Sequence, residues 1–257
     1  MPPSPRPSPR WRTLTTAALA LVAVPATIAA GVFWLEDRRY YLVAMAILVY
    51  SFIPFALAFE RRRPQARELV LLAVMCAIGV AGRAAFFMLP HFKPVAAIVI
   101  VSGAALGPEA GFLVGAMTAL ASNFLFGQGP WTPWQMFGFG VVGLLAGLAF
   151  RPGRLPRRRA WMALFGGVAV LALYGPIVDT SALLMFYARP TAALAWATYG
   201  AGLPVNLVHA AATILFLLVL ARPMMDKLAR VQAKYGLMAP PGEPGRGQGG
   251  VRAPGGS

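Results

Sequence analysis

Polar side chains inside long apolar runs are the groups with which this sequence could do chemistry. Arg83 lies late in one such run, and an arginine at the centre of a membrane-spanning helix costs about 2.5–3.5 kcal/mol on insertion scales. In a later run Tyr199, Asn206 and His209 recur at a spacing that places them within an arc of about 80° on one helix face. That face is directed away from Pro204 and is predicted to point into a helix bundle. Amides, hydroxyls and a guanidinium are hydrogen-bonding groups, so they indicate recognition of a ligand.

Each of these assignments has a structural alternative. Arg83 could extend to the outer membrane surface, and His209 could be a hydrogen-bonded core histidine. Further candidates lie at the ends of the apolar runs, where aromatic residues also form ordinary interfacial belts. Together, the amides, rings and cations there could close over a large, polar, ring-rich solute. These candidate contacts are Phe87, His91, Lys93, Asn123, Gln128, Trp131, Trp134 and Gln135.

The sequence carries no recognisable catalytic or metal-binding pattern. It has no His-Glu-x-x-His, no Gly-x-Ser-x-Gly and no paired acids suited to acid–base catalysis. Cys76 is the only cysteine, and His91 and His209 lie far apart along the chain. We therefore expect no catalytic residues, no metal site and no resident cofactor. An intramembrane enzyme acting on a lipid and an assembly scaffold without a ligand are the alternatives from other functional classes.

The elements that position these side chains are predicted to be membrane-spanning helices. Apolar residues make up 58% of the 257 positions and charged residues 12%, whereas soluble proteins average about 25% charged residues. Residues 110–150 and 190–221 contain no Asp, Glu, Lys or Arg, and each run exceeds the roughly 20 residues that cross a bilayer. We therefore predict an all-α, multi-pass membrane protein. Its candidate spans are residues 13–35, 41–59, 68–88, 94–107, 110–126, 135–150, 160–178 and 192–221.

The net charge of +15 is explained by membrane topology. Most Lys and Arg residues fall on the cytoplasmic side once the amino terminus is placed there, and basic residues are retained on that side. This distribution argues against nucleic acid as a partner and favours lipid headgroups. It predicts a cell-membrane protein with both termini cytoplasmic, although the first span also fits a cleavable signal peptide. The predicted parts are a basic segment at 1–12, two extra helices at 13–59, a core at 67–222, a basic cytoplasmic segment at 223–238 and a disordered Pro/Gly-rich tail at 239–257.

The middle of the chain contains a short span. Pro94–Gly107 would be about 21 Å long, less than the roughly 30 Å hydrocarbon core, so neighbouring helices must shelter its ends. A tight return is predicted at Gly107–Gly111, and interrupted spans of this kind point toward a substrate site. A buried hairpin without a ligand is the alternative.

Small residues form ridges on two spans. Ala73, Ala77 and Ala81 share one face of the span at 68–88, and Gly111 and Gly115 share a face of the span at 110–126. In lipid, such ridges allow two helices to approach closely. The first ridge is expected to dock a partner subunit or to pack within the bundle, and the second to pack within the bundle.

Four segments of this region resemble one family of membrane transport proteins. They read GRAAFFMLPHFKPVAAI at 82–98, GFLVGA at 111–116, SNF at 122–124 and FGQGPWTPWQM at 126–136. Within residues 67–222 the chain is similar to the membrane-embedded substrate-binding (S) component of energy-coupling factor (ECF) vitamin transporters, nearest to the cobalamin type. The loop segments are more specific for this group than for its ligand.

The resemblance implies a six-helix core that binds a vitamin on its external face, with cobalamin or a related corrinoid expected. Another micronutrient or a modified-base precursor would use the same residue types. The resemblance also implies that Ala73, Ala77 and Ala81 dock on a transmembrane coupling subunit that carries two ATPases, and that Leu89–Lys93 forms a lid. The sequence itself lacks a Gly-rich phosphate loop, in keeping with separate ATPase subunits. The two helices at 13–59 depart from the family pattern.

Overall fold

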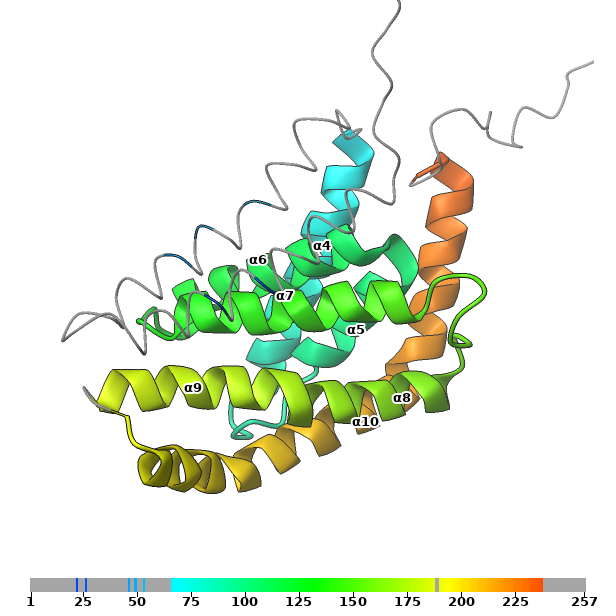
Figure 1. Cartoon of the computed structure of the whole chain (residues 1–257). Helices are drawn as coiled ribbons and strands as arrows, with labels where there is room; N and C mark the ends of the chain where they lie inside the picture. The colour runs from blue at the N-terminus through cyan, green and yellow to red at the C-terminus, as the bar shows by residue number, and fades with distance from the viewer. Residues whose placement is uncertain are drawn as a thin grey trace, which may run out of the picture.

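The computed structural model describes residues 66–187 and 190–237, together with positions 22, 26, 46, 49 and 53. The predicted basic segment 1–12, nearly all of the two helices at 13–59 and the tail 239–257 lie outside the described residues. Figure 1 shows the arrangement of the described helices. They are α4 (Ala66–Ala85), α5 (Val95–Leu106), α6 (Pro108–Phe126), α7 (Thr132–Ala149), α8 (Arg159–Ala169), a π-helix η2 (Val170–Tyr174), α9 (Gly175–Phe186) and α10 (Ala192–Tyr235).

The all-α architecture predicted from composition is confirmed for the described part of the chain. Five of its helices, with Arg159–Phe186 counted as one, are long and apolar enough to cross a membrane. Two helices run further than the sequence predicted: α9 ends at Phe186 instead of 178, and α10 continues to Tyr235 instead of 221. α10 passes through Pro223 because the residues that follow still present a buried apolar face, which includes Leu228. Most of the predicted basic segment 223–238 is therefore the last turns of α10.

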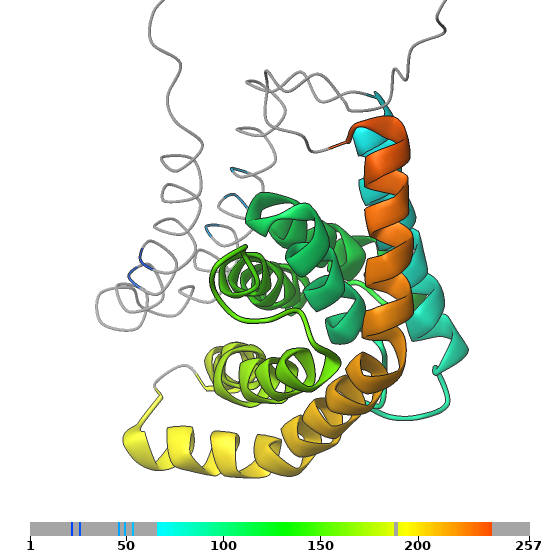
Figure 2. The same cartoon turned by 90° about the vertical axis from the view of Figure 1, so that its right-hand side faces the viewer.

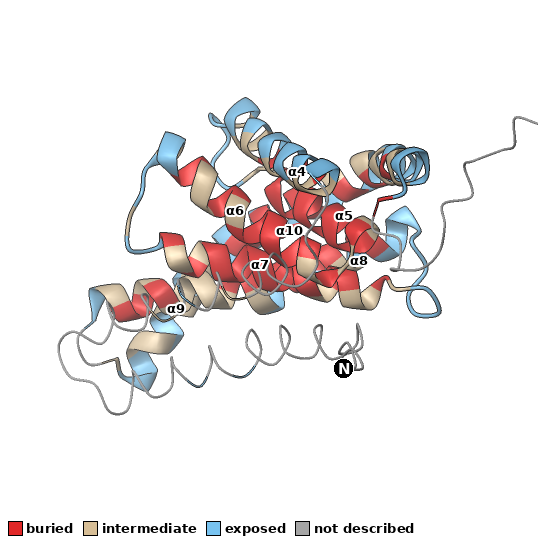
Figure 3. Ribbon diagram, turned by 90° about the horizontal axis from the view of Figure 1, so that it is seen from above, coloured by how far each residue is buried: buried red, intermediate tan, exposed pale blue. Residues whose placement is uncertain are grey.

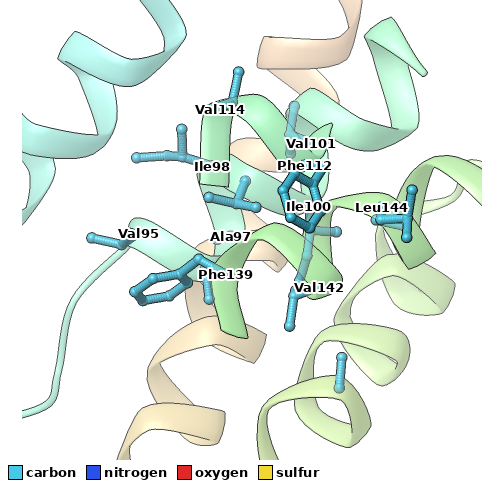
Figure 4. Close-up of a cluster of buried hydrophobic side chains, with 14 of the residues drawn as sticks. Val95, Ala97, Ile98, Ile100, Val101, Phe112, Val114, Phe139, Val142 and Leu144 are labelled. Carbon is cyan, nitrogen blue, oxygen red and sulfur yellow. The ribbon is translucent and has the colours of Figure 1, made fainter. Parts of the chain in front are cut away.

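The short helix α5 forms the centre of the bundle. Every α5 residue except Ala105 is buried, and α4, α6, α7 and α10 all contact it. Figure 3 shows this buried centre, and Figure 4 shows Ile100 of α5 beside Phe112 of α6, in the same buried cluster as Ile98 of α5 and Leu144 of α7. At 12 residues, α5 is about 18 Å long. Its ends are sheltered by its neighbours, as its length required.

Glycine allows the chain to reverse after α5 and allows α6 to pack closely on α7. Gly107 has φ 102°, a conformation that favours glycine, and α6 begins at the next residue, Pro108. A Cβ atom added to Gly143 of α7 would collide with the carbonyl oxygen of Gly111. The small-residue ridge of α6 therefore packs within the bundle. The ridge of α4 differs, because Ala73, Ala77 and Ala81 are exposed.

The long helix α10 connects the two sides of the molecule. Its first part packs against α9 and its middle against α8, and Figure 2 shows that it then changes direction and ends beside the start of α4. The guanidinium carbon of Arg67 in α4 lies 5.6 Å from the ring centroid of Tyr235 at the end of α10. The helices that carry the candidate residues therefore surround α5 from several sides.

Candidate functional site

Arg83 points into the bundle and bonds to the last turns of α6. Its Nη1 atom donates to Ser122 Oγ and to Asn123 Oδ1, both at 2.6 Å. The guanidinium carbon also lies 5.0 Å from the ring centroid of Phe126, a cation–π arrangement. The side chain therefore crosses from α4 to α6 instead of extending to the outer membrane surface. Arg83 and the exposed alanine ridge lie on different faces of α4, as the helical spacing predicted.

Asn123 extends these contacts from α6 to α7. Its side chain is completely buried, and its Nδ2 atom donates to Thr132 Oγ1 at 2.9 Å and to Gln135 Oε1 at 2.8 Å. Thr132 Oγ1 in turn donates to Gln128 Oε1 at 2.8 Å. We call this group, which includes Arg83 and Ser122, the Arg83 network. Thr132 was not among the sequence candidates. Its position directly before Pro133, at the start of a helix, was the feature that could have identified it.

The aromatic candidates divide into exposed and buried groups. The Phe87 ring stacks on Phe126 with 5.3 Å between centroids and is 59% exposed. Trp131 is also exposed. Trp134 is fully buried, and within the described part of the chain its indole N–H has no hydrogen-bond partner. Phe87 and Trp131 can therefore contact a solute at the surface, whereas Trp134 of α7 is buried inside the bundle.

Lys93 holds the loop that joins α4 to α5. Its ammonium group donates to the carbonyl oxygens of Phe86 at 2.8 Å and Leu89 at 2.6 Å, with Phe87 at 3.4 Å. Partial burial and the positive charge of Arg83 lower the pKa of Lys93. The lysine predicted as a ligand contact therefore bonds to the backbone that follows α4 and fixes the loop.

Aromatic packing attaches the same loop to α10. The rings of Phe86 and Phe92 lie with their centroids 4.9 and 5.5 Å from that of Phe216. His91 is exposed at the tip of the loop with φ 57°, a left-handed conformation that is uncommon for a residue other than glycine. The segment expected to act as a lid thus has a defined conformation and a contact with the last helix.

The inward face of α10 forms a second set of polar contacts. Asn206 Nδ2 donates to Asp179 Oδ2 of α9 at 2.8 Å, and the Tyr199 hydroxyl lies 2.9 Å from Thr180 Oγ1. Asn206 is buried while Pro204 is exposed, so the predicted stripe does face the bundle.

The π-helix η2 places Tyr174 beside His209. The Tyr174 ring lies edge-on to the His209 ring, with 4.9 Å between their centroids. The centroid of the Tyr174 ring also lies 4.2 Å from that of Phe139. A single turn of π-helix inside an α-helix is often found at functional sites. Sequence reasoning missed Tyr174, and the signal that could have found it was the Gly175-Pro176 pair that follows.

The loop that follows Arg83 lies beside the helix that carries Asn206 and His209, because Phe86 and Phe92 pack on Phe216 of α10. The described residues contain no group of three or more His, Cys, Asp or Glu side chains that could hold a metal ion. The donors and acceptors of the Arg83 network are bonded to one another. A ligand that binds there must replace these internal hydrogen bonds with its own.

Comparison with known proteins places the chain in a family. A family model described as the ECF-type riboflavin transporter, S component, matches residues 64–226. The chain is 32% identical over 136 residues to a UPF0397 protein of Vibrio atlanticus, in an alignment that covers 49% of this chain and 74% of that protein. UPF0397 proteins of Aliivibrio salmonicida and Aliivibrio fischeri are 32% and 30% identical over 139 residues, with the same coverage. No solved structure matches the chain significantly.

The family match coincides with the helices described above. It begins just before α4 and ends within the last turns of α10, so it includes the Arg83 network, the loop at 86–94 and the inward face of α10. The resemblance to ECF S components inferred from the loop segments is confirmed, and the matching model is of the riboflavin type instead of the cobalamin type. The chain is a multi-pass membrane protein, and it belongs to the family of ECF-type riboflavin transporter S components.

Proposed function

We propose that this chain is the substrate-binding subunit of a vitamin importer in the cell membrane. The observation that carries the proposal is the Arg83 network, in which a guanidinium, three amides and two hydroxyls lie next to the exposed rings of Phe87 and Trp131. Amides offer both donors and acceptors, so a ligand with a mixed polar edge can exchange bonds with them. The rings provide apolar faces for a planar group. Such a site recognises a solute and has no catalytic role.

The ligand that best fits this arrangement is a planar ring system with a hydrogen-bonding edge, such as riboflavin. The contacts of the network are 2.6–2.9 Å long, and the adjoining loop is fixed by Lys93 and by Phe216. Cobalamin, which the loop segments favoured, is the second candidate. It is a larger molecule, so its entry requires the segments around Leu89 and Trp131 to separate further. Another micronutrient or a modified-base precursor is the third.

The remaining contact residues are assigned to the same proposed site. His91 and Lys93 would border the ligand from the loop after α4. Gln128 would do so from the loop before α7 and Gln135 from α7 itself. Tyr199, Asn206 and His209 would border it from α10. Trp134 would support α7 from behind without touching the ligand.

The exposed ridge of α4 supports docking to a partner. Ala73, Ala77 and Ala81 leave a shallow helix face on which another membrane helix can pack closely. We assign this face to a transmembrane coupling subunit that is joined to two ATPase subunits. Import then requires these partners, whereas ligand binding does not. Both termini are assigned to the cytoplasm.

The proposal is tested with the chain purified in detergent. Riboflavin and cyanocobalamin are titrated separately, and bound material is identified by visible absorbance and mass spectrometry. Asn123→Leu removes the amide at the centre of the network, and Phe124→Leu, at a neighbouring position that is 73% exposed, is the matched control. We expect Asn123→Leu to abolish retention and Phe124→Leu to preserve it. Equal retention by both variants, or no binding of any vitamin, would contradict the proposal.

A further inference from the structure

The last turns of α10 extend past any membrane span yet stay attached to the bundle. The helix has 44 residues, which corresponds to about 66 Å, against a hydrocarbon core of roughly 30 Å. Beyond Ala221 its apolar residues, which include Met225 and Leu228, pack against the hydrophobic core. Gln232 Nε2 also donates to the carbonyl oxygen of Ala105 at the end of α5, at 3.2 Å. One face of this segment is thus fixed to the protein.

The opposite face is basic. Arg222, Lys227, Arg230 and Lys234 are all exposed, and at 100° per residue they fall within an arc of about 140°. The same segment contains one acid, Asp226. The apolar and basic residues therefore occupy separate faces of a helix that directly continues a membrane span.

A tyrosine at the end of α10 contacts a cation from each of the two helices. The guanidinium carbon of Arg67 and the ammonium nitrogen of Lys234 lie 5.6 and 5.4 Å from the centroid of the Tyr235 ring. The ring attracts each cation. Arg67 lies in the first turn of α4, so the basic surface joins the start of α4 to the end of α10.

We propose that this surface, formed by Arg67, Arg222, Lys227, Arg230 and Lys234, binds the headgroups of anionic phospholipids. Clusters of Lys and Arg that immediately follow a membrane span attract anionic lipid, and long basic side chains can reach headgroup phosphates from a helix at the interface. Tyr235 is partly exposed, as is typical of tyrosines at the membrane–water boundary. The inference is independent of the identity of the transported ligand. The proposed lipid site lies at the end of the bundle where the start of α4 meets the end of α10.

The test uses the full chain in nanodiscs that contain equal amounts of phosphatidylglycerol and phosphatidylcholine. Native mass spectrometry after release from the nanodisc counts the lipids that remain bound. Lys227→Gln with Arg230→Gln removes two charges from the surface, and Arg158→Gln with Arg159→Gln removes two exposed charges at the start of α8 as the matched control. We expect wild type and the control to retain phosphatidylglycerol preferentially. The surface variant should lose about fivefold in retention per charge removed, equivalent to about 1 kcal/mol each.

A charge-conserving variant, Lys227→Arg with Arg230→Lys, should retain the lipid and so exclude a loss caused by misfolding. Equal losses in the surface and control variants, or equal retention of the two lipids, would overturn the proposal. So would saturation of the surface by inorganic phosphate without any preference for lipid. If the surface variant kept its lipid but lost an acidic partner subunit, the surface would be a protein interface, and the lipid assignment would be wrong.

Discussion

Replacement of Arg83 by methionine separates the structural and ligand-binding contributions of the Arg83 network. The change removes two hydrogen bonds from a charged donor to Ser122 and Asn123, each worth about 1.5–3 kcal/mol. It also removes a guanidinium from a membrane-spanning helix, which recovers about 2.5–3.5 kcal/mol on insertion scales. These effects oppose each other. We therefore expect the free energy of unfolding to fall by only about 0–3 kcal/mol.

Ligand affinity should change more than stability. Without Arg83, the buried Asn123 side chain loses the donor that fixes its oxygen, and the ligand loses a charged hydrogen-bonding partner. A loss of about 1.5–3 kcal/mol raises Kd by about 10- to 150-fold. Arg83→Lys should have an intermediate effect, because an ammonium keeps the positive charge and its N–H donors but lacks the planar guanidinium that lies over the Phe126 ring.

The assay combines detergent unfolding of the purified variants with titration of riboflavin and cyanocobalamin. Arg159→Gln, which removes an exposed charge at the start of α8, is the control and should leave both measurements unchanged. If Arg83→Met lowered the free energy of unfolding by more than about 3 kcal/mol while ligand affinity stayed at the wild-type value, the network would serve only to join α4 to α6. The ligand-binding argument would then be refuted.

Three further predictions concern the packing and the partner. Gly143→Ala should lower the free energy of unfolding by about 1–3 kcal/mol in thermal unfolding, since the new methyl group meets the backbone of the facing helix. Its control, Gly200→Ala, has open space around it and should be neutral or slightly stabilising. Ala77→Trp should abolish ATP-dependent uptake by the reconstituted transporter while ligand binding by the isolated chain persists; a loss of both would place the ridge within the fold. Asn206→Leu should cost about 1–3 kcal/mol of stability, because Asp179 loses its amide donor; an unchanged unfolding curve would show that water replaces this donor.

Helical periodicity alone oriented much of the candidate site. The spacing of Ala73, Ala77 and Ala81 separated them from Arg83, and the structure places the alanines outside and the arginine inside. The stripe that contains Asn206 and His209 was likewise assigned to the inner face of its helix. These predictions succeed because a residue's direction around a helix axis follows directly from its position in the sequence.

The partners of these side chains could not be predicted in the same way. Lys93 bonds to the backbone carbonyl groups that follow α4, and Trp134 is buried instead of facing the surface. Thr132 connects Asn123 to Gln128, and Tyr174 reaches His209 through a π-helix. Each of these outcomes depends on how loops and helix ends are placed, which a periodic pattern does not encode.

The sequence by itself determined that this protein is a bundle of membrane helices with a polar stripe, a small-residue ridge and a basic end, because composition and periodicity specify what each helix face can contact. Only the tertiary structure decided that α5 fills the centre, that the ridge of α4 is exposed, and that the candidate polar groups bond to one another. The physical reason is that hydrogen bonds and close packing depend on distances of a few ångströms between helices, and these distances are set by the fold as a whole.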